Sequence, residues 1–119
     1  MSTQSIVDIN EQAVTSISYH ADEHKRVEGN PKQTLWDIYN DPSEQFGTGI
    51  WQAEKGCWKV SYSEFEYCHI LEGHSVIIDG DGSEKHIKAG DHFVIPAGFE
   101  GQWQVIEPTK KIYVIYDQK

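Results

Sequence analysis

The sequence predicts an all-β barrel or sandwich, on three observations. Short runs rich in β-branched and aromatic residues follow one another from about Leu35 to the end of the chain. Turn signals separate these runs at intervals of roughly 6 to 12 residues. No stretch shows a convincing helical pattern. Short strands at such regular spacing are typical of small all-β domains.

About nine short antiparallel strands are expected, each ending at a turn signal. They cover residues 34–40, 49–53, 57–62, 66–71, 74–79, 85–88, 92–96, 101–106 and 111–116. The clearest turns are the hairpin signal "GDGSE" after the fifth strand, the "EG" at Glu72–Gly73 after the fourth, and "EPTK" between the last two. The first 27 residues are polar and weakly patterned, so we expect an N-terminal arm over 1–27 and one domain over 28–119.

The strand predicted at 57–62 alternates cleanly, and this assigns faces to its side chains. Trp58, Val60 and Tyr62 share one face and are expected to point inward. Cys57 shares the other face with Lys59 and is expected to point outward. Cys68 is expected to point inward with Glu66, so a disulfide between the cysteines is not expected. Free thiols fit a reducing cytoplasm, and the N-terminus has no signal-peptide pattern.

Charge and hydropathy exclude several classes of partner. The formal net charge is −9, with a sequence pI near 5.0. Such a surface repels phosphate backbones and anionic lipids, so we expect neither nucleic acid nor membrane as a partner. No segment approaches the roughly 20 apolar residues of a membrane span. His20 and His24 lie four residues apart near the N-terminus and are interpreted as a solvated pair.

Two short motifs in the second half identify a family. The first is Glu66, six residues, then Gly73; the second is Gly90, five residues, then Pro96-x-Gly98. Glycines here suit turns that need positive φ, and Pro96 suits a strand end. In this order the motifs resemble those of the cupin superfamily. The resemblance implies a cupin-type double-stranded β-helix, a jelly-roll barrel.

The resemblance narrows to one subfamily. The stretches "EGNPKQTLWDIYN", "GIWQAEKGCWKV" and "GDHFVIPAGFEGQW" are similar to small single-domain cupins. These are related to the cupin domain of (S)-ureidoglycine aminohydrolase and to the ethanolamine-utilisation cupin. The similarity covers residues 28–116, and it implies a homodimer. Trp36 and Trp51 are expected at the subunit interface.

The metal ligands of the family are mostly missing here. Metal-binding cupins use His-x-His, then the Glu of the first motif, then a His three residues after the second motif. In this chain the corresponding positions hold Val60 and Tyr62, or Lys59 and Ser61 one register shorter, then Glu66, then Gly101. One carboxylate does not hold a transition metal tightly, so no cofactor is expected.

A rebuilt metal site is the alternative. Tyr62, Glu66 and His92 could supply it if His92 points inward. His69 follows Glu66 by three residues and is expected on the opposite face of the strand.

The interior offers other chemistry. An inward Glu66 requires a hydrogen-bond donor, for which Tyr62 or a Trp N–H is a candidate, and it is a candidate catalytic acid or base. Trp58, Tyr62, Glu66 and Trp103 are the candidate ligand-binding residues, with filling of the barrel core as the structural alternative.

Three functions follow from these residues. The first is metal-free binding of a small polar metabolite. The second is an enzyme of hydrolase or isomerase type, acting on a small ureido- or carbonyl-containing metabolite with Glu66 as acid or base. The third is a structural or partner-binding barrel that displays outer residues such as Tyr67 and His69.

Overall fold

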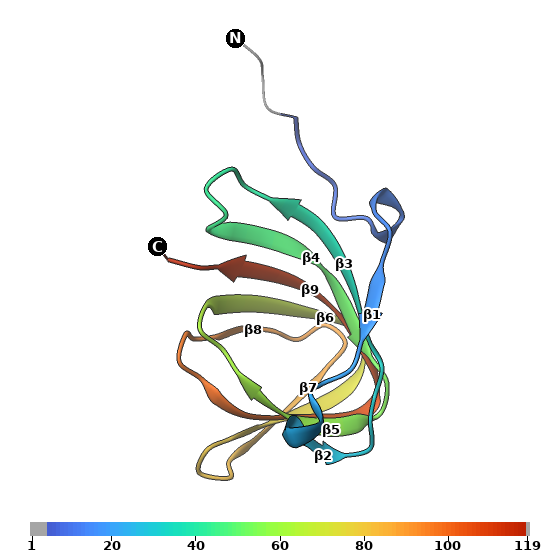
Figure 1. Ribbon diagram of the computed structural model, residues 1–119, viewed down its shortest axis with the longest axis vertical. Helices are drawn as coiled ribbons and strands as arrows, with labels where there is room; N and C mark the ends of the chain where they lie inside the picture. The colour runs from blue at the N-terminus through green and yellow to red at the C-terminus, as the bar shows by residue number, and fades with distance from the viewer. Residues whose placement is uncertain (1–4, 119) are drawn as a thin grey trace.

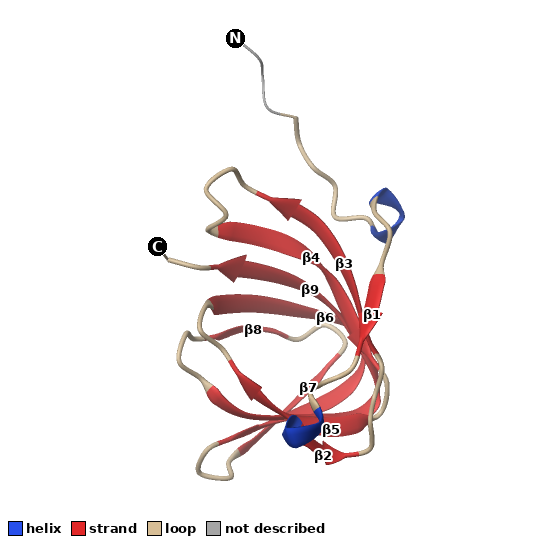
Figure 2. Ribbon diagram, viewed as in Figure 1, coloured by secondary structure: helices blue, strands red, loops and turns tan. Residues whose placement is uncertain are grey.

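The computed structural model describes residues 5–118, and within them the chain forms nine strands and two short 3₁₀ turns (Figures 1 and 2). The strands are β1 (Ile17–Tyr19), β2 (Arg26–Glu28), β3 (Gln33–Asn40), β4 (Phe46–Ala53), β5 (Gly56–Ser61), β6 (Phe65–Asp79), β7 (Glu84–Lys88), β8 (His92–Ile95) and β9 (Glu100–Tyr116). The 3₁₀ turns are η1 (Glu11–Ala13) and η2 (Glu23–Lys25). The predicted all-β class is confirmed.

All nine strands belong to one antiparallel sheet that folds into two layers. The first layer contains β1, β3, β4, the C-terminal half of β9, the N-terminal half of β6, and β8. The second contains β2, β5, the N-terminal half of β9, the C-terminal half of β6, and β7. In Figure 2 the two layers meet at one side of the molecule and separate toward the other. This double layer is the predicted jelly-roll arrangement.

Two of the expected turns are instead bends inside long strands. β6 spans 15 residues and β9 spans 17, so the predicted turns at Glu72–Gly73 and at 107–110 do not end a strand. Gly73 has φ of 91°, and a Cβ there would lie 2.1 Å from the carbonyl oxygen of Pro108. Both strands change layer where their backbones approach this closely. The expected positive φ at Gly73 is confirmed, but the residue supports a bulged bend within β6 rather than a hairpin turn.

The predicted arm contributes two strands to the sheet. β1 pairs with β3, and β2 pairs with β5. Before them the chain runs away from the body as an extended segment, in which Ile6 is almost fully exposed (Figure 1). Residues 1–4 of the predicted arm lie outside the described residues.

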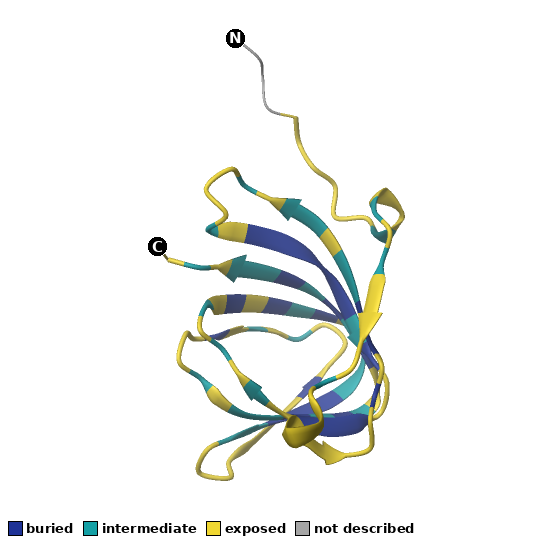
Figure 3. Ribbon diagram, viewed as in Figure 1, coloured by how far each residue is buried: buried dark blue, intermediate teal, exposed yellow. Residues whose placement is uncertain are grey.

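The core lies between the two layers (Figure 3). Trp103, Ile70, Ile87 and Val105 are fully buried there. Their inward positions alternate with polar or exposed neighbours, as a sheet with one buried face requires. Within the described residues, no helix is long and apolar enough to cross a membrane.

Cys57 lies on the face opposite Trp58, Val60 and Tyr62, as expected, but its side chain is buried on that outer face. It is only 4% exposed, although it lies outside the main core cluster. β2 and β9 flank it on both sides, with Glu28 and Gln104 as its cross-strand neighbours, and its thiol lies 3.5 Å from the side-chain oxygen of Gln102. The flanking strand β2 straddles the predicted boundary between the arm (1–27) and the domain (28–119), where no strand was expected. Both Cys57 and Cys68 are free thiols.

Candidate functional site

A pocket of about 250 Å³ opens between the two layers. Four of its lining residues are the predicted ligand-binding set: Trp58, Tyr62, Glu66 and Trp103. The other lining residues are Tyr19, Gln33, Leu35, Trp51, Val60, Lys111, Tyr113 and Ile115. At roughly 30 Å³ for each water molecule, the pocket has room for about eight waters or one small metabolite. It is mostly aromatic, with a few polar groups that converge on one side.

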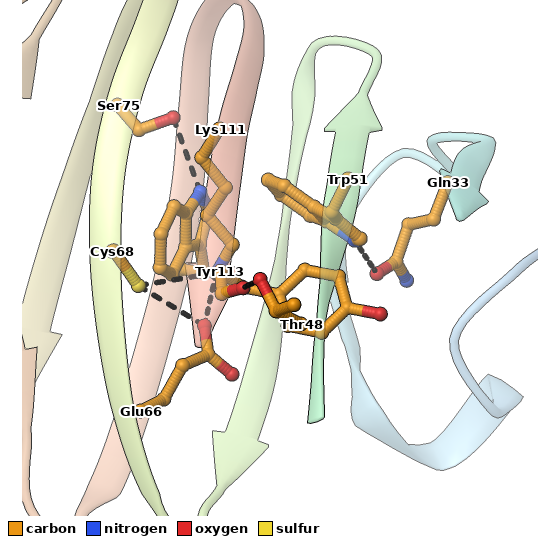
Figure 4. A network of polar contacts seen from close by, with 9 residues as sticks. Gln33, Thr48, Trp51, Glu66, Cys68, Ser75, Lys111 and Tyr113 are labelled. Carbon is orange, nitrogen blue, oxygen red and sulfur yellow. Dashed lines mark hydrogen bonds and ion pairs between the residues drawn. The ribbon is translucent and has the colours of Figure 1, made fainter. Parts of the chain in front are cut away.

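The polar side of the pocket is a buried ion pair between Glu66 and Lys111. Glu66 extends inward from β6 and Lys111 from β9, and they are 7% and 5% exposed. Nζ of Lys111 lies 2.5 Å from Oε2 of Glu66 (Figure 4). The thiol of Cys68 donates to the same oxygen at 3.0 Å, and Nζ of Lys111 contacts its sulfur at 3.5 Å. Lysine is the donor that an inward Glu66 requires, where the sequence suggested Tyr62 or an indole.

The ammonium group of Lys111 also lies over two indole rings. It is 4.4 Å from the ring centroid of Trp103 and 4.8 Å from that of Trp51. Burial disfavours the charge on Lys111, but Cys68 and Glu66 outweigh this effect and raise the pKa of the lysine. Lys111 is therefore a fixed cation at neutral pH, held by a carboxylate and by the electron-rich faces of two rings.

One oxygen of Glu66 remains available. Oε2 accepts from both Lys111 and Cys68, while within residues 5–118 no group bonds to Oε1. The described residues also include no fully buried side-chain oxygen or nitrogen without a partner. Oε1 is thus reached through the pocket, and it points away from the ammonium group in Figure 4. It is an acceptor that a bound molecule can use.

The indole walls are held by their own polar atoms. Nε1 of Trp51 donates to Oε1 of Gln33, and Nε1 of Trp103 donates to the hydroxyl of Ser75, both at 3.1 Å. Ser75 is itself bonded to Thr109 at 2.6 Å. Both N–H groups are thus occupied by the protein, and the faces of both rings lie beside the ammonium group of Lys111.

Two further groups beside the ion pair keep their protons at neutral pH. Burial raises the pKa of Tyr62 well above its ordinary value. Burial likewise raises the pKa of Cys68 to about 12. Tyr62 packs beside Phe99, with ring centroids 6.2 Å apart, and its hydroxyl has no partner among the described residues. It is a second group that a ligand could meet.

The arrangement does not fit the metal ion that the cupin fold implies. Of the positions that would supply ligands, Val60 carries no donor and Glu66 is already paired with a cation. At Gly101 even a Cβ would lie 2.1 Å from the backbone oxygen of Ile78. No side chain, histidine included, enters there without moving backbone. The ligand positions are filled by groups that exclude the ion.

The alternative site from Tyr62, Glu66 and His92 is not assembled. His92 is exposed on the outer face of β8, where its ring packs beside Tyr67 and His69. The idea that it points inward is wrong, because alternation along β8 turns Phe93 and Ile95 toward the core instead. His69 lies on the outer face as expected. Within residues 5–118, no three His, Cys, Asp or Glu side chains form a group suited to a metal.

Sequence reasoning missed two residues of the site. Lys111 begins the run "KIYVIY", in which both alternating faces are largely apolar, so alternation alone does not show which face points inward. The only signal was that Lys111 shares a face with Tyr113. Trp51 was expected at a subunit interface, but it lies inside the barrel, opposite Lys111 in the register of β4 and β9. Trp36 lies on the outer face, beneath Lys110.

Comparisons with known proteins agree with the fold. Ethanolamine utilization protein Q from Salmonella typhimurium is 20% identical, over 73% of this chain and 71% of that one, with a TM-score of 0.65. EutQ from Clostridium difficile is 22% identical, over 80% and 78%, with a TM-score of 0.65. A DUF861-family protein from Thermotoga maritima is 36% identical, over 54% and 73%, with a TM-score of 0.53. No curated protein matches the sequence.

The sequence also matches a family model over most of the barrel. The model describes the EutQ-like cupin domain and matches residues 40–113. This range includes both sequence motifs. The link to (S)-ureidoglycine aminohydrolase stays a prediction. The two motifs, the two-layered sheet and this match together assign the chain to the EutQ-like cupin family.

Proposed function

We propose that this cupin binds a small polar molecule in the barrel pocket without a metal ion, and that the Glu66–Lys111 pair recognises its polar end. The single observation that carries the proposal is the unpartnered Oε1 of Glu66 at the pocket surface. A carboxylate oxygen in such a dry position gains most from a ligand that donates an N–H or O–H. Lys111 beside it offers N–H groups to an acceptor.

These two groups together define the class of ligand. A donor for Glu66 and an acceptor for Lys111 must lie side by side on the same small molecule. Amide and ureido groups have this arrangement at neutral pH, and they are flat. Flat groups can also pack against the aromatic wall of the pocket, to which Trp51, Trp58 and Trp103 contribute. Because the ion pair is neutral as a whole, a strongly charged ligand gains less than a neutral one.

The indole N–H signals in a ¹H–¹⁵N spectrum test the proposal. The probes are acetamide, acetate and methylammonium, added to the full chain at millimolar concentrations. We expect acetamide to shift the signals of Trp51, Trp58 and Trp103 most. The signal of Trp36, which is outside the pocket, serves as the internal control. Equal small shifts with all three probes, or shifts only at Trp36, would contradict the proposal.

Two variants separate recognition from folding. Glu66→Gln removes the charged acceptor and is expected to abolish the acetamide response. Tyr62→Phe leaves the ion pair intact and is expected to weaken the response only moderately, so it covers the case in which Glu66→Gln does not fold. If both variants respond as the wild type does, the pocket is not the binding site.

Catalysis is the second candidate, and Lys111 is the observation in its favour. A fixed cation next to a carboxylate can stabilise negative charge that develops on a carbonyl oxygen, while Glu66 transfers a proton. The raised pKa of Lys111 makes it unsuitable as a nucleophile. An enzyme of hydrolase or isomerase type would lose turnover in Lys111→Met. A binding protein has no turnover to lose.

We also propose a homodimer in the cytoplasm. Exposed apolar side chains on the outer face of the first layer support self-association; they include Phe65, Tyr67, Val94 and Tyr116. Two free thiols support a reducing compartment. Sedimentation equilibrium distinguishes a dimer from a monomer. A partner-binding barrel would instead stay monomeric and use the same face.

A further inference from the structure

The hairpin of β6 and β7 carries two histidines on its outer face, and neither lines the barrel pocket. His74 lies on β6 and His86 on β7, and they are diagonal neighbours because His86 pairs directly with Val76 (Figure 1). Nε2 of His74 lies 3.0 Å from Nδ1 of His86. The ring centroids are 5.2 Å apart, with the planes tilted by 38°. We propose that His74 and His86 form a binding site for a divalent transition-metal ion.

The spacing of the two nitrogens is that of neighbouring ligands on one metal ion. Imidazole nitrogens bind Zn²⁺ at about 2.0–2.1 Å. Two such bonds at a right angle place the nitrogens about 3.0 Å apart, and at the tetrahedral angle about 3.4 Å apart. Because the hairpin already holds the nitrogens at 3.0 Å, binding needs only a small opening of the rings. Little conformational entropy remains to be lost.

In the free protein the short N–N distance requires one ring to donate a proton to the other. Metal binding requires both facing nitrogens to be unprotonated. The proton on Nε2 of His74 then moves to Nδ1 of the same ring through water. Both rings reach solvent, so this exchange is open. The charge balance is simple: the ion binds two neutral imidazoles.

Glu84 supports the arrangement of His86. Its Oε1 lies 3.7 Å from Nε2 of His86, on the opposite side of the ring from His74. A carboxylate at this position favours a proton on Nε2 and leaves the lone pair of Nδ1 facing His74. Histidines that bind metals commonly have such a partner on their other nitrogen. The net charge of −9 also favours the approach of a cation.

The donor set limits the kind of ion. Two imidazoles suit Zn²⁺, Ni²⁺ or Cu²⁺ and do not suit Mg²⁺ or Ca²⁺, which prefer oxygen. Among residues 5–118 no third His, Cys, Asp or Glu completes a group with the pair, so water fills the remaining positions. The site is therefore open and exchangeable, in contrast to a structural zinc site with four protein ligands.

The chain contains a matched control for this geometry. His69 on β6 and His92 on β8 also face each other on neighbouring strands, on the outer face of the first layer, whereas His74 and His86 lie on the outer face of the second. Their ring centroids are 6.0 Å apart, and no hydrogen bond joins their nitrogens. This second pair has the same residue types on adjacent strands of the same sheet, but it lacks two nitrogens at ligand spacing.

The test is calorimetric titration of the tag-free full chain with ZnCl₂ and, separately, with MgCl₂, at pH 7.5 and at pH 5.5. We expect one Zn²⁺ per chain at pH 7.5, weaker binding at pH 5.5 because protons compete, and no heat with Mg²⁺. His74→Gln and His86→Gln are each expected to weaken binding by roughly tenfold or more, and Glu84→Gln by several-fold. His69→Gln and His92→Gln should bind as the wild type does.

The outcomes are decisive in either direction. Absence of a Zn²⁺ equivalent in the wild type would overturn the proposal. So would wild-type affinity in both His74→Gln and His86→Gln, or an equal loss in His69→Gln. Long-range ¹H–¹⁵N spectra of the imidazole rings locate the ion independently of affinity. They are expected to change at His74 and His86 and to stay constant at His69 and His92.

Discussion

The ammonium nitrogen of Lys111 lies 2.5 Å from Oε2 of Glu66, inside the barrel. Glu66 is the motif carboxylate that ligates the ion in metal-binding cupins, and here a side chain of the protein supplies the cation. The charge of Glu66 is therefore balanced without a cofactor. The same pair leaves one carboxylate oxygen facing the pocket.

The first prediction concerns the stability of this ion pair. Removal of one partner leaves a charge in a buried site, so Lys111→Met and Glu66→Gln are each expected to lower the free energy of unfolding by about 3–5 kcal/mol. The double variant Glu66→Gln/Lys111→Met is expected to lose much less than the sum of the single losses. Urea denaturation of the variants measures the difference.

The partly exposed pair Lys110–Glu11 is the matched control, with a 2.8 Å separation and a more exposed carboxylate. Glu11→Gln should change stability by less than about 1 kcal/mol. Additive losses in the double variant of Glu66 and Lys111 would show that the two side chains do not depend on each other.

The second prediction concerns alkaline pH. Burial raises the pKa of Cys68 from 9.0 to about 12. Above pH 9 the unfolded thiol loses its proton while the folded thiol keeps it, so the free energy of unfolding falls as pH rises from 9 toward 12. The slope is at most about 1.4 kcal/mol per pH unit for one group. Raised pKa values of Tyr62 and Tyr113 extend the loss above pH 10.

Cys68→Ser isolates the contribution of the thiol, since the hydroxyl still donates to Glu66 but does not titrate in this range. Urea unfolding at pH 8, 9 and 10 should give a shallower fall for the variant than for the wild type. An identical fall would mean that the thiol is not protected from deprotonation by burial.

The third prediction concerns the position of the missing metal ligand. Gly101→Ala is expected to destabilise the protein by several kcal/mol, since its Cβ would approach the Ile78 carbonyl oxygen to 2.1 Å. Gly80→Ala is the control, because its Cβ would meet no atom nearer than 3.9 Å. Thermal melting compares the two. Equal melting temperatures would mean that the strands separate easily at Gly101.

The fourth prediction concerns the wall of the pocket. Ser75 is fully buried and accepts the indole N–H of Trp103. Ser75→Ala leaves that N–H without a partner, at a cost of about 1–3 kcal/mol, and the emission of Trp103 is expected to shift. Exposed Ser61 has no side-chain bond among the described residues, so Ser61→Ala should have little effect. A neutral Ser75→Ala would mean that water replaces the hydroxyl.

The sequence predicted the barrel well where one face of a strand is clearly apolar. The alternation at Trp58, Val60 and Tyr62 gave the correct inner face, and Gly73 and Gly90 have the expected positive φ. These features are local, because they depend on side-chain parity and on backbone conformation at single residues.

Other features depend on contacts between distant segments, which one sequence does not contain. Cys57 is paired with Glu28 of β2, a strand that the sequence did not predict, and the position of Lys111 arises from the partners that β9 meets. A lysine in a strand is normally solvent-exposed. Only the approach of Glu66, from 45 residues earlier in the chain, makes its burial favourable.

The two long strands also determine how the protein comes apart. β6 and β9 pair from Phe65 with Tyr116 to Asp79 with Gly101, so the same two backbones run through both layers. Neither layer is a separable unit, because opening one pulls on strands that form the centre of the other. The barrel is expected to unfold as a single cooperative unit. The slowest backbone amides to exchange with solvent will then be those of β6 and β9, on either side of the bend at Gly73, and will exchange only when the whole domain unfolds.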